Sequence, residues 1–311
     1  MDFDHGISAI DTGFFRPRFD ASHLILERSR AAFVDVGTNH SVPRLLAELE
    51  SKRIAVDAVD YVILTHVHLD HAGGAGALMR HLPNARLVVH PRGVRHMIDP
   101  SQLVAGATAV YGAEEVQRSY GMLMPVPAER IDTANDGHVV DLAGRQLLCL
   151  DTPGHARHHI SIYDARSRAF FPGDTFGLSY REFDTDQGAF ILPTSTPVQF
   201  EPDALHASIE RMLSYAPEQM FLTHYSRVTG VPRLAQDLHV QIDAMVAIAR
   251  AQAGDAYRHT RIAEELANLY ISRAQAHGCA LSDVQIRELL AMDIELNAQG
   301  LEVWLDRQRA Q

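Results

Sequence analysis

The sequence predicts a mixed α/β protein that continues into a helical extension. Three observations lead to this fold class. Residues 1–230 contain short apolar runs bounded by turn residues, which are typical of buried strands and alternate with segments of helical periodicity. Several of these runs end in loops that carry histidine or aspartate. From residue 231 to 311 the pattern is helical throughout, so we expect two domains, 1–230 and 231–311.

The first third of the chain alternates strands and helices. The segment HLILERSRAAFVDVG (23–37) predicts two short strands around a polar turn. In SVPRLLAELESKRI (41–54), leucines at helical spacing, an early proline and Ser41 as a candidate N-cap predict a helix. A strand, a helix of small residues and another strand follow at 60–66, 72–82 and 85–90.

The middle of the chain is richer in strands than in helices. Residues 91–130 read as helical and irregular, and a proline-marked loop ends them. Apolar runs predict strands within 138–154, 159–164, 168–174 and 219–224, with a helix at 203–217. Ala143-Gly144 predicts a hairpin turn. The C-terminal helices are expected at 232–254, 259–278 and 282–308.

The composition favours a small-molecule substrate. The chain has a formal net charge of −11 and no long cluster of lysine or arginine, which disfavours a nucleic-acid partner. No apolar stretch approaches the roughly 20 residues of a membrane span, and the acidic N-terminus does not resemble a signal peptide. Cys149 and Cys279 form no CxxC pair, and Cys149 is expected to be a buried apolar residue. We therefore expect a cytoplasmic protein without a membrane partner.

The segment THVHLDHAGG (65–74) places three histidines and an aspartate directly after an apolar strand. His66 and His68 are two residues apart, so both side chains point the same way while the chain stays extended. Asp70 and His71 follow the bend and can face a neighbouring point. Imidazole nitrogen and carboxylate oxygen are ligands for Zn²⁺, Fe²⁺ and Mn²⁺. The segment therefore predicts a metal site.

Three later strand ends supply further side chains of the same kind. His155 follows a Thr-Pro-Gly bend, Asp174 follows Pro-Gly, and His224 ends an apolar run. Functional groups concentrate on such loops. Seven candidate ligands are too many for one tetrahedral ion and suit two ions. The first ion is assigned His66, His68 and His155, the second Asp70, His71 and His224, and Asp174 bridges both.

Four motifs in this order, THVHLDH, TPGH, PGD and LTH, resemble the metallo-β-lactamase superfamily of metallo-hydrolases over about residues 5–230. The resemblance implies an αββα sandwich with a dinuclear site at one edge between the sheets. The segments ILTHVHLDHAGGAGAL, VVHPRGVRHMIDPSQLV and DTPGHARHHISIYD resemble a group of largely uncharacterised hydrolases within the superfamily. The resemblance thus implies a type of reaction and leaves the substrate open.

Two divalent ions, zinc first with iron or manganese as alternatives, can hold a bridging hydroxide that attacks a carbonyl or a phosphorus. Asp70 is expected to act both as ligand and as catalytic group, because its carboxylate can orient the water and pass a proton to the leaving group. We expect hydrolysis of a small carboxylic ester, lactone or thioester, as in acyl-homoserine lactonases and hydroxyacylglutathione hydrolases. Asp35 is a candidate hydrogen-bond partner of a ligand imidazole, and one of His158 and His159 is expected to brace the loop.

Other branches of the superfamily fit this sequence less well. True β-lactamases usually have arginine where His71 stands and cysteine where Asp174 stands, and the flavodiiron branch has glutamate where His68 stands. Persulfide dioxygenases use one iron, and nuclease branches carry extra domains or basic RNA-binding arms. A phosphodiesterase and an iron-dependent oxidoreductase on the same scaffold are the alternatives, together with a non-catalytic protein that has a structural metal site.

The residues that contact the substrate are harder to identify. Tyr180 follows Asp174 by six residues, and the lactonases place a tyrosine shortly after the bridging aspartate, so Tyr180 is a candidate for binding the substrate carbonyl. The insert at 99–127 and the aromatic segment 180–195 are expected to form the pocket walls. Apolar faces on the helices of 231–311 predict packing or a homodimer.

Overall fold

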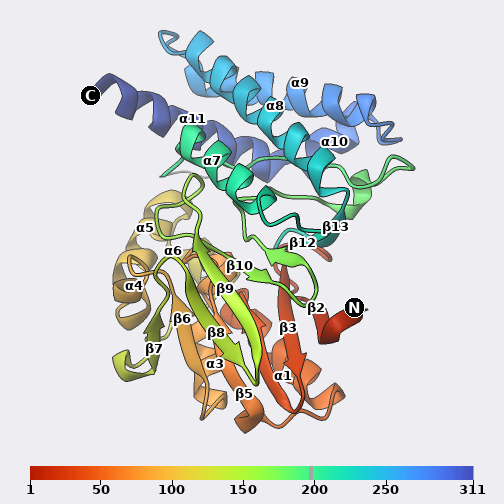
Figure 1. Ribbon diagram of the computed structural model, residues 1–311. Coiled ribbons are helices and arrows are strands. Elements are labelled where there is room, and N and C mark those ends of the chain that lie inside the picture. Colours follow the sequence, from red (N-terminus) through yellow and green to blue (C-terminus); the bar gives the residue numbers. More distant parts are fainter. Residues whose placement is uncertain (196–198, 311) are drawn as a thin grey trace. The chain divides into compact units, whose positions relative to one another are not determined.

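A computed structural model of the chain describes residues 1–195 and 199–310. They form a mixed α/β fold with two β-sheets and C-terminal helices, which confirms the predicted fold class (Figure 1). By internal contacts the chain divides into two compact units. Unit 1 comprises Met1–Asp151, His158–Gly173 and Met220–Arg227, and unit 2 comprises Thr152–Arg157, Asp174–Gln219 and the residues from Val228 onward.

The first sheet of unit 1 follows the order of the chain. Its strands, all within residues 1–195, are β1 (Asp2–Phe3), β2 (Ile7–Asp11), β3 (Ala21–Glu27), β4 (Arg30–Val34), β5 (Val59–Ile63), β6 (Arg86–Val89) and β7 (Ile131–Thr133). The pairs from β1 to β4 are antiparallel, and those from β4 to β7 are parallel. Among the parallel strands, β4 and β6 carry the buried apolar runs AAFV and LVV, as expected where both faces of a sheet are covered.

The second sheet has the order β13-β12-β11-β10-β9-β8. Its strands are β8 (His138–Leu142), β9 (Arg145–Asp151), β10 (Ile160–Asp164), β11 (Ala169–Phe171), β12 (Gln219–Leu222) and β13 (Ser226–Thr229). Leu142 pairs with Arg145, and Ala143 and Gly144 both have positive φ, of 53° and 93°. The predicted hairpin turn is therefore present, with the backbone that a two-residue loop requires.

Alternation along the strands produces two cores in unit 1. In β4, Phe33 joins a cluster with Leu45 and Leu78 of the covering helices, whereas its neighbours Ala32 and Val34 face the other way. That other cluster lies between the sheets and contains Cys149, which confirms its expected burial. The strand ends that carry the candidate ligands are thus fixed by a packed interior.

Helices of unit 1 lie beside the first sheet (Figure 1). They are α1 (Val42–Ser51), α2 (Leu69–Ala72), α3 (Ala75–His81), α4 (Val94–Ile98), α5 (Ser101–Tyr111) and α6 (Ala113–Tyr120), with 3₁₀ turns at Asp4–Gly6, Asn39–Ser41, Val56–Ala58 and Ala128–Arg130. Ser41 occupies the N-cap position of α1, as predicted, but its side chain accepts a bond from the Thr38 N–H at 3.1 Å and none from the first turn of α1.

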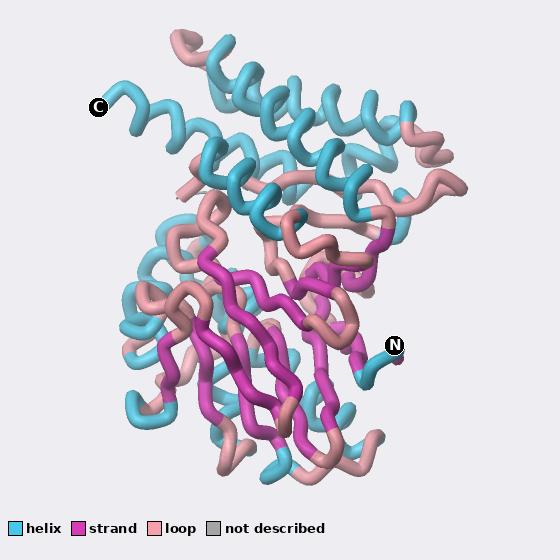
Figure 2. Tube along the Cα trace, viewed as in Figure 1, coloured by secondary structure: helices cyan, strands magenta, loops and turns pink. Residues whose placement is uncertain are grey.

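Unit 2 is mainly helical (Figure 2). It contains the 3₁₀ turn Arg181–Phe183 and the helices α7 (Pro202–Leu213), α8 (Val231–Ala251), α9 (Arg258–Ala276), α10 (Asp283–Leu289) and α11 (Ala291–Ala310). The single helix predicted at 282–308 is wrong, since a capping box between Ser282 and Gln285 starts α10 and a second helix begins after Leu290.

The compact units do not coincide with the expected division at residue 230. Residues 174–219 group with the C-terminal helices, and their mutual contacts include hydrogen bonds from Ser195 to Asn297 and from Tyr180 to Asp293. The domain boundary at 230 stays a prediction. Within the described residues, no helix combines the length and the apolar character needed to cross a membrane.

Candidate metal centre

The loop after β5 brings His66 and His68 together. Leu64 still donates its backbone N–H to Val88 O at 2.9 Å, and His68 is extended, with φ −64° and ψ 151°, before α2 begins. His66 Nε2 and His68 Nδ1 lie 2.9 Å apart. Two imidazole nitrogens on one tetrahedral zinc are about 3.4 Å apart, so a small side-chain shift would allow both to bind one ion.

A second group consists of Asp70, His71 and His224. Their candidate ligand atoms all lie within 4.8 Å of one another. Asp70 Oδ2 is 3.9 Å from His71 Nε2 and 3.6 Å from His224 Nε2. Asp70 and His71 belong to the single turn α2, and His224 follows β12, so residues far apart in the sequence converge in unit 1.

Hydrogen bonds orient both imidazoles of this group. His71 Nδ1 donates to Asp35 Oδ2 at 2.8 Å, and His224 Nδ1 donates to the Phe19 carbonyl oxygen at 2.9 Å. When Nδ1 carries the hydrogen, the Nε2 lone pair is the ligand atom. Both Nε2 atoms face Asp70. The donor set and its orientation therefore fit a divalent metal ion.

Asp35 connects several strand ends of unit 1. Besides His71, its carboxylate accepts hydrogen bonds from the Thr65 N–H and hydroxyl, both at 2.8 Å, and from the Thr223 hydroxyl at 3.0 Å. Asp35 is buried, with 1% of its surface exposed. The hydrogen bond expected between Asp35 and a candidate ligand is therefore present. Through its bonds to Thr65 and Thr223, Asp35 also connects the loop of His66 with that of His224.

The other two candidate ligands lie in unit 2. His155 Nε2 is 3.5 Å from Asp174 Oδ2, and both residues are buried. The segment of His155 is held by α7, because Ser208 Oγ donates to Pro153 O at 2.6 Å and the Glu201 N–H donates to Gly154 O at 2.8 Å. The joining of this pair with the histidines of unit 1 stays a prediction.

His158 and His159 belong to unit 1. His158 Nδ1 accepts from the Val67 N–H at 3.5 Å, and burial lowers the pKa of His158 to about 3. The ring of His159 lies 5.0 Å from that of His66. The bond from Val67 places His158 in the bracing role expected for one of these two residues.

A loop that the sequence reasoning missed lies against His224. Phe19 is buried, and its ring centroid is 5.3 Å from that of His224. The Phe15 ring lies 5.2 Å from that of Phe19, the Arg16 guanidinium lies 5.3 Å from the Phe19 centroid, and 62% of Phe15 is exposed. The sequence feature that could have identified this loop is the run GFFRPRF (13–19), which is unusually rich in aromatic and cationic residues.

Asp20 closes this loop. The Thr12 hydroxyl donates to Asp20 Oδ2 at 2.9 Å, and the Thr12 N–H donates to Asp20 O at 3.0 Å. Burial, which outweighs the attraction of His224 and His71, raises the pKa of Asp20 to about 7. The loop is thus held at its base by a buried carboxyl group and its threonine partner.

Tyr180 is fully buried in unit 2, and its hydroxyl donates to Asp293 Oδ1 at 3.0 Å. The hydroxyl thereby joins the segment after Asp174 to α11. The predicted contact of Tyr180 with a substrate stays a prediction.

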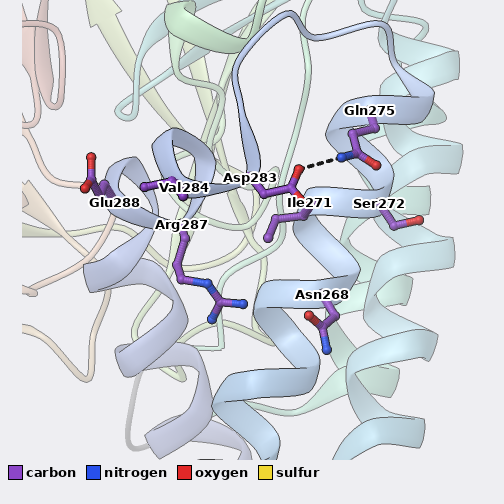
Figure 3. Close-up of a pocket in the computed structure, with 8 residues that line it drawn as sticks. All are labelled: Asn268, Ile271, Ser272, Gln275, Asp283, Val284, Arg287 and Glu288. Carbon is purple, nitrogen blue, oxygen red and sulfur yellow. Dashed lines mark hydrogen bonds between the residues drawn. The ribbon is translucent and has the colours of Figure 1, made fainter.

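Each unit contains a cavity that none of the candidate ligands lines. One of about 790 Å³ in unit 1 runs along α4 and α5 and is lined by Ile98 and, within the insert 99–127 that was expected to form a pocket wall, by Val104 and Leu123. Another of about 420 Å³ lies between α9 and α10 in unit 2, where Gln275 Nε2 donates to Asp283 Oδ1 at 2.6 Å (Figure 3). Neither cavity is lined by a candidate metal ligand.

Comparison with known proteins gives one family. The family model described as the Metallo-beta-lactamase superfamily matches residues 16–224, more than half of the chain. The Metallo-beta-lactamase fold-containing protein ST1585 of Sulfurisphaera tokodaii is 23% identical over 237 residues, 75% of this chain and 81% of that protein. A hydroxyacylglutathione hydrolase of Aeromonas hydrophila is 28% identical over 198 residues, 63% of this chain and 58% of that enzyme.

Solved structures share the fold. The structure of ST1585 from Sulfolobus tokodaii matches with a TM-score of 0.69, 21% identity and coverage of 96% of this chain and 98% of that chain. The metallo-beta-lactamase family protein TTHA1429 from Thermus thermophilus gives a TM-score of 0.68 at 17% identity, covering 98% of this chain and 94% of that chain. At these identities the likeness concerns the fold alone.

Proposed function

Because this chain belongs to the metallo-beta-lactamase superfamily and its loops gather histidine and aspartate, we propose that it is a metal-dependent hydrolase. The proposal rests on the arrangement of Asp70, His71 and His224. In this group, the hydrogen bonds that His71 Nδ1 donates to Asp35 and His224 Nδ1 donates to the Phe19 carbonyl turn both imidazoles toward the Asp70 carboxylate. Such outer hydrogen bonds are characteristic of metal-binding histidines.

The proposed centre holds two divalent ions, with zinc as the first candidate. One ion takes His66, His68 and His155, the other takes Asp70, His71 and His224, and Asp174 serves both. The 2.9 Å approach of His66 to His68 and the 3.5 Å approach of His155 to Asp174 support this assignment. His155 follows β9, and Asp174 follows Gly173 of unit 1, so the chain itself ties this pair to strand ends of the second sheet.

When bound, two divalent ions lower the pKa of a water to about 7 and polarise the substrate oxygen. The chain's own residues position the reacting groups. His71 and His224 are buried, whereas 25% of the Asp70 side chain is exposed. Asp70 is therefore the member of the group that can take a proton at its carboxylate and deliver it to the leaving group.

The proposed substrate is a small carboxylic ester, lactone or thioester. One relative is named a hydroxyacylglutathione hydrolase, and its similarity to this chain spans little more than half of that enzyme. The loop of Phe15 and Arg16 beside His224 supplies an aromatic surface and a cation. These groups suit an ester whose acyl or leaving part carries an apolar group and a negative charge.

A substrate panel on the full-length, zinc-loaded protein tests the proposal. We expect turnover of carboxylic esters, lactones or thioesters, without consumption of oxygen. Asp70→Asn and His68→Ala should abolish turnover and leave the fold intact. Asp186→Asn, which changes an exposed aspartate, is the matched control and should keep its turnover. Oxygen uptake, turnover of phosphodiesters alone, or near-normal hydrolysis by Asp70→Asn would contradict the proposal.

A further inference from the structure

Four titratable side chains outside the candidate metal centre form a crossed arrangement between α7 and α8 in unit 2. The helices lie side by side (Figure 1). Each carries a histidine followed one turn later by a carboxylate, namely His206 and Glu210 on α7 and His239 and Asp243 on α8. His206 Nε2 is 3.2 Å from Asp243 Oδ1, and His239 Nε2 is 2.8 Å from Glu210 Oε1.

The carboxylates fix the tautomer of both rings. An ionised carboxylate only accepts hydrogen bonds, so each Nε2 carries a hydrogen, and in a neutral imidazole Nδ1 is then a lone pair. His206 Nδ1 and His239 Nδ1 are 2.6 Å apart. Two neutral rings would therefore point lone pairs at each other at hydrogen-bond distance, which is repulsive. A positive species between the two nitrogens removes the repulsion.

The ring geometry identifies that species. The ring planes are 21° from parallel and the centroids are 4.9 Å apart, which is the Nδ1–Nδ1 distance extended by one ring radius at each end. The two nitrogens therefore meet head-on, and a metal ion has no room on the line between them. We propose that His206 and His239 share one proton between their Nδ1 atoms, so that α7 and α8 are joined by a proton-dependent clasp.

The charges around the clasp favour a bound proton. Glu210 and Asp243 place negative charge at both ends of the paired rings, and no lysine or arginine among the described residues pairs with either. Asp237, on α8, is bound by Arg233 at 2.8 Å and by Arg273 at 2.7 Å. The side chains of His206 and His239 are 26% and 19% exposed, so the proton exchanges with solvent.

The clasp acts on the helix that supports His155. Helix α7 holds the segment Thr152–Arg157 through the Ser208 hydroxyl and the packing of Gly154 against the Leu205 backbone. Loss of the proton leaves two lone pairs in contact and loosens α7 from α8. The support of this segment therefore depends on whether the shared proton is bound. The inference does not depend on the proposed hydrolase activity.

Nuclear magnetic resonance of the full-length protein labelled with ¹⁵N-histidine tests the clasp. At pH 7 we expect one strongly deshielded ring proton that correlates with Nδ1 of both His206 and His239. His206→Phe and His239→Phe should each abolish this signal. His259→Gln is the matched control, because His259 on α9 lies between Glu302 and Glu295 and has no histidine partner among the described residues; the signal should persist in this variant.

Glu210→Gln and Asp243→Asn provide a second test that keeps both imidazoles and a hydrogen-bond acceptor for each Nε2. Removing a negative charge weakens the hold on the proton, so we expect the signal to disappear at a lower pH than in the wild type. Two separate rings with bare Nδ1 atoms from pH 6 to pH 8 would overturn the proposal. So would a signal that survives in His239→Phe, or one whose pH range is unchanged in Glu210→Gln.

Discussion

Asp35 accepts the Nδ1–H of His71 at 2.8 Å, and the same carboxylate binds the threonines that precede His66 and His224. One buried side chain thus sets the orientation of a candidate ligand and the spacing of two loops. The strength of the proposed metal site should depend on Asp35 even though it is not itself a proposed ligand.

Replacement of Asp35 by asparagine should weaken metal binding about 10- to 100-fold, because the amide presents only one acceptor oxygen to four donors. Competition with a chelator measures the affinity. Asp60→Asn, which removes the negative charge that pairs with Arg30 at the surface of β5, is the control. Equal metal affinity in Asp35→Asn and the wild type would show that the orientation of His71 does not depend on this bond.

Arg145 and Asp164 form a buried ion pair in unit 1, with Nε–Oδ1 and Nη2–Oδ2 distances of 3.1 and 2.5 Å. Arg145→Met leaves the carboxylate buried without its partner and should lower the free energy of unfolding by about 3–5 kcal/mol. Arg118→Met breaks an exposed pair with Glu115 on α6 and should change it by less than about 1 kcal/mol. Chemical denaturation measures the free energy of unfolding of both variants. Similar decreases in the two variants would contradict the larger contribution expected from the buried pair.

The same pair predicts an acid transition. Burial tends to raise the pKa of Asp164, but the hydrogen bonds from Arg145 and Ser167 outweigh it and hold the pKa below its usual value of 3.8. The ionised carboxylate therefore stabilises the fold above about pH 4, and this contribution is lost as the pH falls through the lowered pKa. In Arg145→Met the loss should begin at a higher pH.

His23 predicts a second pH dependence. Its side chain is buried between the rings of Phe171 and Phe221, and its Nε2 has no hydrogen-bond partner among the described residues. Burial, helped by the charge of the N-terminus, lowers the pKa of His23 to about 3. Between about pH 6.5 and pH 3 the unfolded chain binds a proton there and the folded protein does not, so the free energy of unfolding falls as the pH falls through this range.

His23→Leu removes this proton uptake. Its free energy of unfolding should exceed that of the wild type by an amount that grows by up to about 1.4 kcal/mol per unit as the pH falls from 6 to 4. Measurements at pH 8, where both states hold a neutral imidazole, provide the internal control. A difference between the two proteins that is the same at pH 8 and pH 5 would contradict the buried, neutral state of His23.

The loop beside His224 predicts a change in substrate affinity. Phe15→Ala and Arg16→Ala should each raise KM for an aromatic, anionic ester about tenfold and leave kcat nearly unchanged, because these side chains would hold the part of the substrate that does not react. Tyr257→Ala, at an exposed aromatic of unit 2, is the control. A fall in kcat at constant KM would place the loop in the chemical step instead.

Local pattern was sufficient to predict much of unit 1. Apolar runs such as VDYVI mark buried strands, and the spacing of His66 and His68 on an extended segment is enough to expect their approach. The position of Asp35 at a strand end suggested its role. In each case the relevant geometry is set by neighbours in the chain or by the register of adjacent strands.

Features that depend on the packing of distant surfaces could not be predicted in this way. The bond between Tyr180 and Asp293 depends on where α11 lies within unit 2, and the pairing of His206 with His239 depends on which faces of α7 and α8 meet. The break at Leu290, where φ is −101° and ψ is 11°, divides the expected helix into α10 and α11. Helical periodicity alone does not distinguish these outcomes.

The metal content of the protein after reconstitution with zinc and removal of excess ions tests the central claim most directly. We expect two ions per chain for the wild type and for Asp186→Asn, and fewer for a variant that combines His155→Ala with Asp174→Asn. One ion or none in the wild type, or an unchanged content in that double variant, would contradict a two-metal centre built from these seven side chains.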